Sequence, residues 1–181
     1  MRRSGYGLSV EVPTGWSAAI GRRPGDDDAV LSARGIAPPA ASAGRDAAPV
    51  ERTLPVAHLC SRAIPSGTGD FGAGLVELLT GEDVFIALVE YGSDLAGTGL
   101  FERSGWPRLA PSQFSPNRMF RQLPGRSASQ HFFSVADRAF CLYTVIGEHS
   151  RRMASVPRAA GVVRTLGAES AASMRRRGVV V

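Results

Sequence analysis

The stretch of sequence that decides the fold reads Gln130-His-Phe-Phe-Ser-Val-Ala-Asp-Arg-Ala-Phe-Cys-Leu-Tyr-Thr-Val-Ile-Gly147. Two runs rich in aromatic and β-branched residues flank a polar break at Ala136-Asp137-Arg138. Such runs are typical of strands, so the stretch predicts a β-hairpin buried in the core of a sheet. The spacing of His131, Cys141 and Tyr143 matches no metal-ligand or nucleophile pattern, and we interpret these residues as structural.

The composition is that of an ordinary globular protein. The 181 residues are 44% hydrophobic and 20% charged, which predicts one domain with a substantial core. No run approaches the ~20 apolar residues of a membrane span. Met1-Arg2-Arg3 is followed by an alternating segment and not by the apolar run of a secretory leader, so we expect a cytoplasmic location.

The charge is basic, and all 21 cationic side chains are arginines. With abundant Ala and Gly, this usage is typical of a GC-rich genome, so we interpret most arginines as a solvated surface and nucleic acid as an unlikely partner. The two cysteines, Cys60 and Cys141, lie in apolar segments and are expected to be buried thiols.

The N-terminal segment alternates with a period of two. Apolar residues recur from Leu8 to Val12 and again from Trp16 to Ile20, on either side of Pro13-Thr14-Gly15. We expect these runs to pair as a hairpin. Antiparallel pairing would gather four arginines at one end of the sheet as an anion-binding patch, which the aspartates at 26–28 could neutralise: Arg2, Arg3, Arg22 and Arg23.

The remaining segments complete an α+β domain with an antiparallel sheet. Residues 24–52 predict a flexible insertion because they contain few large apolar side chains. Residues 53–64 and 83–92 predict strands, the first with Ala57, Leu59 and Ala63 on its buried face. Helices are predicted over 70–81, 117–123 and 155–167, so the domain spans residues 1–167, and 168–181 form a basic, disordered tail.

The connection between residues 93 and 129 is long and rich in proline. Connections of this length are usually functional or close over a groove. It carries more large apolar side chains than a loop needs, which predicts a surface that binds another protein. The candidate binding residues are Leu100, Phe101, Trp106, Phe114, Met119 and Phe120.

Catalytic and metal-binding residues fall into no recognised pattern. His58 and Cys60 share one side of a strand, but no close ligand pair accompanies them, and we predict no metal site. The glycine-rich segment 67–74 lacks the lysine of a phosphate-binding loop, and we predict no cofactor. No elbow motif positions a serine. A triad would have to combine Ser134 or Ser150 with His131 or His149 and Asp137, and a carboxylate pair would come from Glu82, Asp83 and Glu90.

A family resemblance rests on the opening Tyr6-Gly-Leu-Ser-Val-Glu-Val-Pro-Thr-Gly-Trp16. A strand that ends in Pro-x-Gly-Trp resembles the first strand and turn of PsbP-like domains, and the order of elements is similar. The resemblance implies an antiparallel sheet with helices packed on it and a role in binding other macromolecules. The chain departs from the pattern at 24–52 and at 104–124. It also resembles a family of small actinobacterial proteins.

These observations predict a non-catalytic protein-binding domain of the cytoplasm, such as an adaptor or a chaperone. The alternative hypothesis is anion or nucleic-acid binding through the arginine patch, which requires steep dependence on salt. A hydrolase is the third, and it would need a buried histidine or carboxylate with a perturbed pKa in a pocket.

Overall fold

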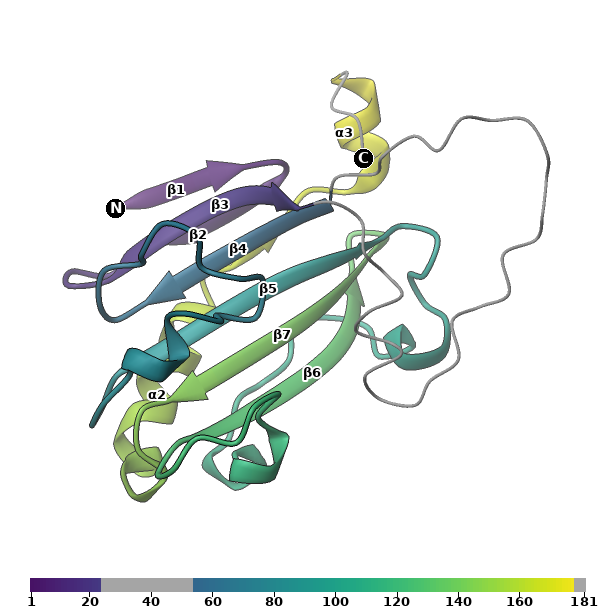
Figure 1. The fold of residues 1–181 in the computed structure, drawn as a ribbon. Helices are drawn as coiled ribbons and strands as arrows, with labels where there is room; N and C mark the ends of the chain where they lie inside the picture. Colours follow the sequence, from purple (N-terminus) through teal and green to yellow (C-terminus); the bar gives the residue numbers. More distant parts are fainter. Residues whose placement is uncertain (24–53, 178–181) are drawn as a thin grey trace.

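The computed structural model describes residues 1–23 and 54–177. Its centre is a five-stranded antiparallel sheet in the order β3-β4-β5-β7-β6 (Figure 1). The fold is α+β, as predicted. The strands are β3 (Ser17–Arg23), β4 (Leu54–Cys60), β5 (Val84–Gly92), β6 (Ser127–Val135) and β7 (Arg138–Ile146).

The hairpin predicted over residues 130–147 is formed by β6 and β7. Its turn consists of Ala136 and Asp137, whose φ angles of 53° and 56° match the left-handed turn that fits the twist of a hairpin. Arg138 belongs to β7 and is 0% exposed, so its assignment to the polar break was wrong. Its guanidinium is buried because Glu90 on β5 accepts two hydrogen bonds from it.

A second sheet has three strands in the order β1-β2-β8, with β1 at Arg2–Gly5, β2 at Leu8–Glu11 and β8 at Gly167–Ala168. The predicted pairing of 8–12 with 16–20 was wrong. β2 pairs instead with β1, and the turn between them is formed by Tyr6 and Gly7, which both have positive φ. β3 pairs with β4 in the large sheet. Period-two alternation identifies strands but does not specify their partners.

One face of the large sheet is covered by the helix α2 (Arg152–Val163) and by β2. Figure 1 shows α2 behind the sheet. The helix begins at Arg152, three residues before the predicted start. It ends at Val163, before the predicted end at 167. An apolar stripe of α2 packs here, and the helical members of this α2-side core are Val156, Ala159, Val162 and Val163.

The opposite face carries a second core. It includes Phe85 and Ala87 of β5 and Tyr143 of β7, covered by Leu75 and Leu79. Both faces of β4 are buried, so the prediction of one buried face was wrong, and Ala63 is exposed beyond the end of the strand.

The helix predicted over 70–81 is reduced to one 3₁₀ turn, η1 (Val76–Leu78). Gly72 and Gly74 adopt positive φ, and a Cβ at Gly72 would lie 2.5 Å from the Phe85 ring. The chain therefore bends against β5 where a helix would have to continue.

The long connection wraps around the edge strand β6. Ser104 bridges to Ser134 and Ser115 bridges to Ala128. It contains three 3₁₀ turns, η2 (Gly99–Phe101), η3 (Pro111–Gln113) and η4 (Pro116–Arg118), and another, η5 (His149–Arg151), precedes α2. The helix predicted over 117–123 is only η4, which Ser115 caps by accepting a hydrogen bond from the Asn117 N–H.

The predicted tail is ordered through Arg177, so this expectation was wrong for 168–177. Ser170 caps a short helix, α3 (Ala171–Arg176), whose Ala171 and Met174 are buried. The predicted insertion at 24–52 and the end of the tail at 178–181 lie outside the described residues. No helix within 1–23 and 54–177 is long and apolar enough to cross a membrane.

The buried thiols Cys60 and Cys141 are both free, and they are far apart. Cys60 lies opposite Phe85 and Cys141 opposite Val89 on β5, which lies between their strands. Their positions therefore differ by about 13 Å along the strands and about 10 Å across them. A disulfide needs Cα atoms within about 7 Å, so these two residues do not form one.

Candidate binding site at Trp106

A pocket of about 550 Å³ lies between the long connection and the C-terminal half of α2. Pockets of this size accommodate small molecules or single anchoring side chains. Residues from both elements line it: Trp106, Pro107, Arg108, Leu109, Ala160, Val163 and Arg164.

Trp106 is held in place by aromatic packing on the hairpin. Its ring centroid lies 5.4 Å from that of Phe133 and 6.3 Å from that of Phe140, with the second pair stacked. Pro107 is buried and fixes the chain as it leaves the tryptophan. The wall is preformed, because the indole rests on the two strands of the central hairpin.

Two arginines stand at the rim of the pocket. Arg108 and Arg164 are exposed and line it from opposite sides. Among the ion pairs of the described residues, neither arginine has a carboxylate partner. The pocket therefore combines an apolar wall with a positive rim.

The six residues predicted to form one binding groove do not lie together. Trp106 and Phe114 pack in the α2-side core, whereas Phe101 and Met119 pack on the opposite face of the sheet. The connection passes from one face to the other as it wraps β6, so its apolar residues are divided between two cores. Phe101, Phe114 and Met119 are buried.

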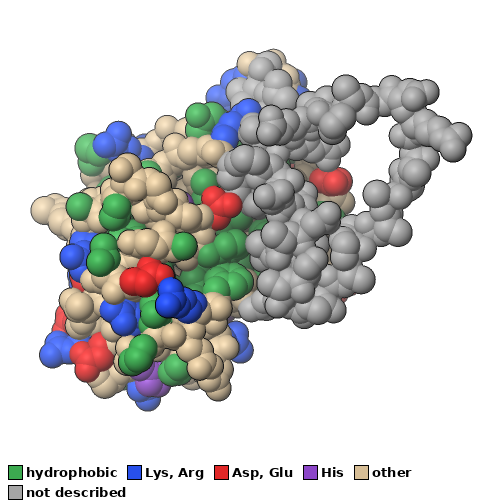
Figure 2. Space-filling model, viewed as in Figure 1, with side chains coloured by type: hydrophobic (Ala, Val, Ile, Leu, Met, Phe, Trp, Pro, Cys, Tyr) green, Lys and Arg blue, Asp and Glu red, His purple; other side chains and the backbone are tan. Residues whose placement is uncertain are grey.

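Phe120 and Leu100 are the exposed members of the set, at 44% and 41%. Phe120 lies on the face away from α2, where its ring packs 4.8 Å from that of Tyr143. Figure 2 views the molecule as in Figure 1, and hydrophobic side chains are visible among basic and acidic ones on the described surface. Only Trp106 of the six lines the pocket described above.

The four arginines predicted to converge do not all lie together. β1 and β3 run in the same direction (Figure 1), because the turn after β1 is at Tyr6 and Gly7. Arg3 consequently lines a cleft with Trp16 and Ser17 at the start of β3, while Arg22 near its end lies 4.9 Å from the centre of the Tyr6 ring. The hairpin that was predicted to gather the four arginines does not form, so Arg3 lies apart from Arg22.

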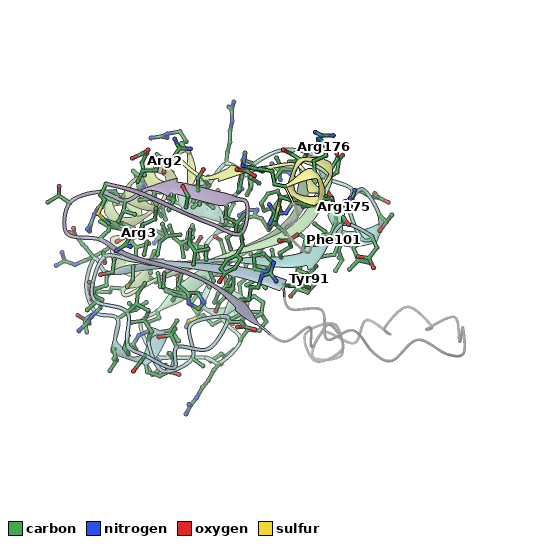
Figure 3. All side chains as sticks on the ribbon, turned by 90° about the horizontal axis from the view of Figure 1, so that it is seen from above. Arg2, Arg3, Tyr91, Phe101, Arg175 and Arg176 are labelled. Carbon is green, nitrogen blue, oxygen red and sulfur yellow. The ribbon has the colours of Figure 1, made fainter. Side chains whose placement is uncertain are left out.

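Two of these arginines nevertheless line one groove of about 910 Å³ beside the small sheet. Small residues such as Ser4, Ser9 and Gly167 line it, and so do Arg2, Arg22 and Arg177. Arg177 pairs with Glu169, and Arg2 lies 4.0 Å from Glu11. Figure 3 shows that Arg2 and Arg3 are well separated from Arg175 and Arg176 of α3.

The serines considered for catalysis have structural partners. Ser134 donates to the Phe101 carbonyl at 2.6 Å and accepts from the Gly97 N–H at 2.8 Å. It points to the face of β6 opposite to that of His131, because side chains alternate along a strand. Ser150 donates to Glu148 at 2.8 Å.

The carboxylates considered as an acid–base pair each form an ion pair with arginine. Glu90 is paired with Arg138 inside the core, Glu82 with Arg151 and Arg158, and Asp83 with Arg62. Glu90 and Asp83 flank opposite ends of β5 and do not form a pair.

The histidine considered as a metal ligand supports a loop. His58 hydrogen-bonds to the Asp70 carbonyl at 2.8 Å, and burial lowers its pKa. Burial also raises the pKa of the neighbouring Cys60 to about 11, which keeps the thiol protonated. The described residues contain no group of three or more His, Cys, Asp or Glu side chains that could hold a metal ion.

The sequence analysis did not predict the two arginines at the rim of the pocket, Arg108 and Arg164. Arg108 follows Trp106 closely, and the segment Trp-Pro-Arg-Leu combines an aromatic, a rigid and a cationic residue. This local pattern could have identified Arg108 as a candidate binding residue. Arg164 lies more than fifty residues away in the chain, and only the packing of α2 brings it to the same pocket.

Comparisons of the chain with protein-family models, with curated proteins and with solved structures found no match. The resemblance to PsbP-like domains therefore stays a prediction.

Proposed function

We propose that the protein is a non-catalytic binding domain whose Trp106 pocket receives a segment of another protein. The segment presents an apolar anchor side chain with a carboxylate beside it. The observation that carries this proposal is the pairing of an apolar pocket with two rim arginines that have no carboxylate partner among the described residues.

The chemistry of the rim supports an acidic partner. Arginine presents a planar fork of donors that matches a carboxylate in two-point contact. An apolar side chain would displace water from the Trp106 wall, and the two arginines would fix its orientation. Tryptophan and arginine are also the residue types that contribute most to binding at protein interfaces.

The test is selection from a random-sequence peptide display library against the folded protein. Enriched peptides are expected to contain an aromatic or large aliphatic residue next to Asp or Glu. Synthetic versions of these peptides should bind at least tenfold more weakly to Arg108→Glu and Arg164→Glu variants, since each reverses a charge at the rim. Isothermal calorimetry measures the change.

Arg121→Glu is the matched control, because Arg121 is exposed, also has no ion pair among the described residues, and does not line the pocket. It should bind the selected peptides like the wild type. Equal losses in all three variants, or enriched peptides without acidic residues, would refute the proposal. Both rim residues are exposed, so the substitutions should leave the fold intact.

A second candidate function is binding of an anionic ligand in the groove beside the small sheet. Its support is the presence of Arg2, Arg22 and Arg177 in the lining of one groove. The partial neutralisation of Arg2 and Arg177 by Glu11 and Glu169 makes it the weaker candidate. A hydrolase remains the third and has the least support, because the candidate serines have structural partners.

Heparin chromatography tests the anion hypothesis. The salt concentration for elution should fall in an Arg2→Gln, Arg22→Gln double variant and stay unchanged in Arg3→Gln, since Arg3 lies outside the groove. No retention of the wild-type protein at low salt would reject this function.

A further inference from the structure

Four buried hydroxyl groups lie on the α2 side of the large sheet. They belong to Ser127 and Ser129 of β6, Thr144 of β7 and Ser155 of α2, and each residue is 0% exposed. None of the four oxygens has a hydrogen-bond partner among the described residues. The same face also buries the Arg138–Glu90 ion pair and the His131 Nε2, which likewise has no hydrogen-bond partner among the described residues.

The strand members share one face. Ser129 lies directly opposite Thr144 in the β6–β7 register, and Ser127 is two residues before Ser129. Residues two apart on a strand point to the same side, so the three hydroxyls lie on one surface. Leu142 and Ile146 flank Thr144 on β7 and pack in the α2-side core, which identifies that surface as the face under α2.

The fourth hydroxyl belongs to Ser155 on α2, which packs against this face of the sheet. Ser155 precedes the core residue Val156 and lies one turn before Ala159, on the side of α2 that faces the sheet. The chain around it is held to the start of β6, because the His149 N–H donates to the Gly125 carbonyl at 2.6 Å. Ser155 is therefore a buried hydroxyl on the helix that packs on β7, on the same side of the sheet as the strand hydroxyls.

Unpartnered hydroxyls are costly in this position. A buried polar group without a hydrogen bond loses its hydration and gains nothing in return. Four such groups in one layer would remove a large part of the stability of a domain of this size. A polar guest that bonds to several of them removes the penalty.

The guest should be small and uncharged. Hydroxyls both donate and accept, as water does, and a water molecule in a protein interior typically makes about three hydrogen bonds. Burial, with help from Arg103 and Arg118, lowers the pKa of His131 on the same face to about 4, so its ring is neutral at neutral pH. The four hydroxyls supply no charge that would offset the desolvation of an ion.

We propose that ordered water molecules occupy the layer formed by Ser127, Ser129, Thr144 and Ser155 and join α2 to β6 and β7. The helix is then attached to the sheet through water at Ser155, in addition to the direct apolar contacts of Val156, Ala159, Val162 and Val163. Because α2 forms one wall of the Trp106 pocket, the water layer also helps to position that wall.

A double-mutant cycle tests this assignment. Thr144→Val and Ser155→Ala each remove one water-bonding hydroxyl with little change in shape, so each should lower the midpoint of thermal unfolding. The double variant should lose less than the sum of the two, because both residues act through the same water molecules. Transfer of magnetisation from water to the amides of residues 129 and 144 in NMR spectra gives an independent readout.

Thr144→Val combined with Ser134→Ala is the control pair. Ser134 lies on the other face of β6 and bonds directly to protein atoms, so its effect should add to that of Thr144→Val. The proposal is overturned if Thr144→Val and Ser155→Ala raise the unfolding midpoint, which removal of an unpartnered hydroxyl would do. Additive effects without water contacts in the NMR spectra would overturn it equally.

Discussion

Arg138 and Glu90 form an ion pair whose side chains are both 0% exposed. The Arg138 Nε donates to one carboxylate oxygen at 2.9 Å and Nη2 donates to the other at 2.5 Å. The same guanidinium donates to the carbonyls of Tyr6, Gly7 and Glu169. One side chain thus connects the central hairpin, the turn between β1 and β2, and the chain before α3.

Replacement of Arg138 by Leu should strongly destabilise the protein. It leaves the Glu90 carboxylate buried without a counter-charge, and such changes typically cost about 3–5 kcal/mol. Chemical denaturation measures the loss. The double variant Arg138→Leu, Glu90→Leu should recover part of it, because neither charge is then buried alone. A double variant less stable than Arg138→Leu would contradict this account.

Stability should fall as the pH is lowered from about 6.5 to about 4. The pKa of His131 is lowered from 6.5 to about 4, chiefly by burial, so the unfolded chain binds a proton in this window that the folded chain does not. The pKa of His58 is also lowered and acts in the same direction. Unfolding free energies across this range should show a smaller decrease for His131→Gln. An unchanged slope would show that His131 does not titrate as described.

The two thiols should be unreactive in the folded protein. Cys60 and Cys141 are both 0% exposed, and burial raises the pKa of Cys60 to about 11, so almost no thiolate forms at neutral pH. A disulfide-exchange reagent such as Ellman's reagent should titrate both groups in denaturant and neither within minutes under native conditions. Rapid modification of the native protein would contradict the burial of these residues.

A glycine comparison tests the close packing of the 67–80 segment on β5. Gly72→Ala should destabilise by more than Gly67→Ala, although both residues have positive φ. A Cβ at 72 would lie 2.5 Å from the Phe85 ring, whereas one at 67 meets no atom within 4 Å. The backbone penalty of about 1 kcal/mol is common to both. Equal thermal midpoints for the two variants would rule out the close contact.

The sequence by itself determined the strands of the large sheet and β2, the buried hairpin and the α+β class, but not β1 or β8. Period-two alternation and runs of β-branched and aromatic residues are local signals, and β5, β6, β7 and the apolar stripe of α2 follow from them. The same signals failed where glycines set the backbone, as at Gly72 in the predicted helix over 70–81.

Only the tertiary structure decided which elements meet. The partner of β2 depends on the turn at Tyr6 and Gly7 and on β8, which is distant in the chain. This pairing placed Arg3 apart from Arg22, and the path of the long connection around β6 placed Trp106 and Phe101 on opposite faces of the sheet. Arg164 reaches the Trp106 pocket through the packing of α2, and no local pattern encodes a contact across that distance.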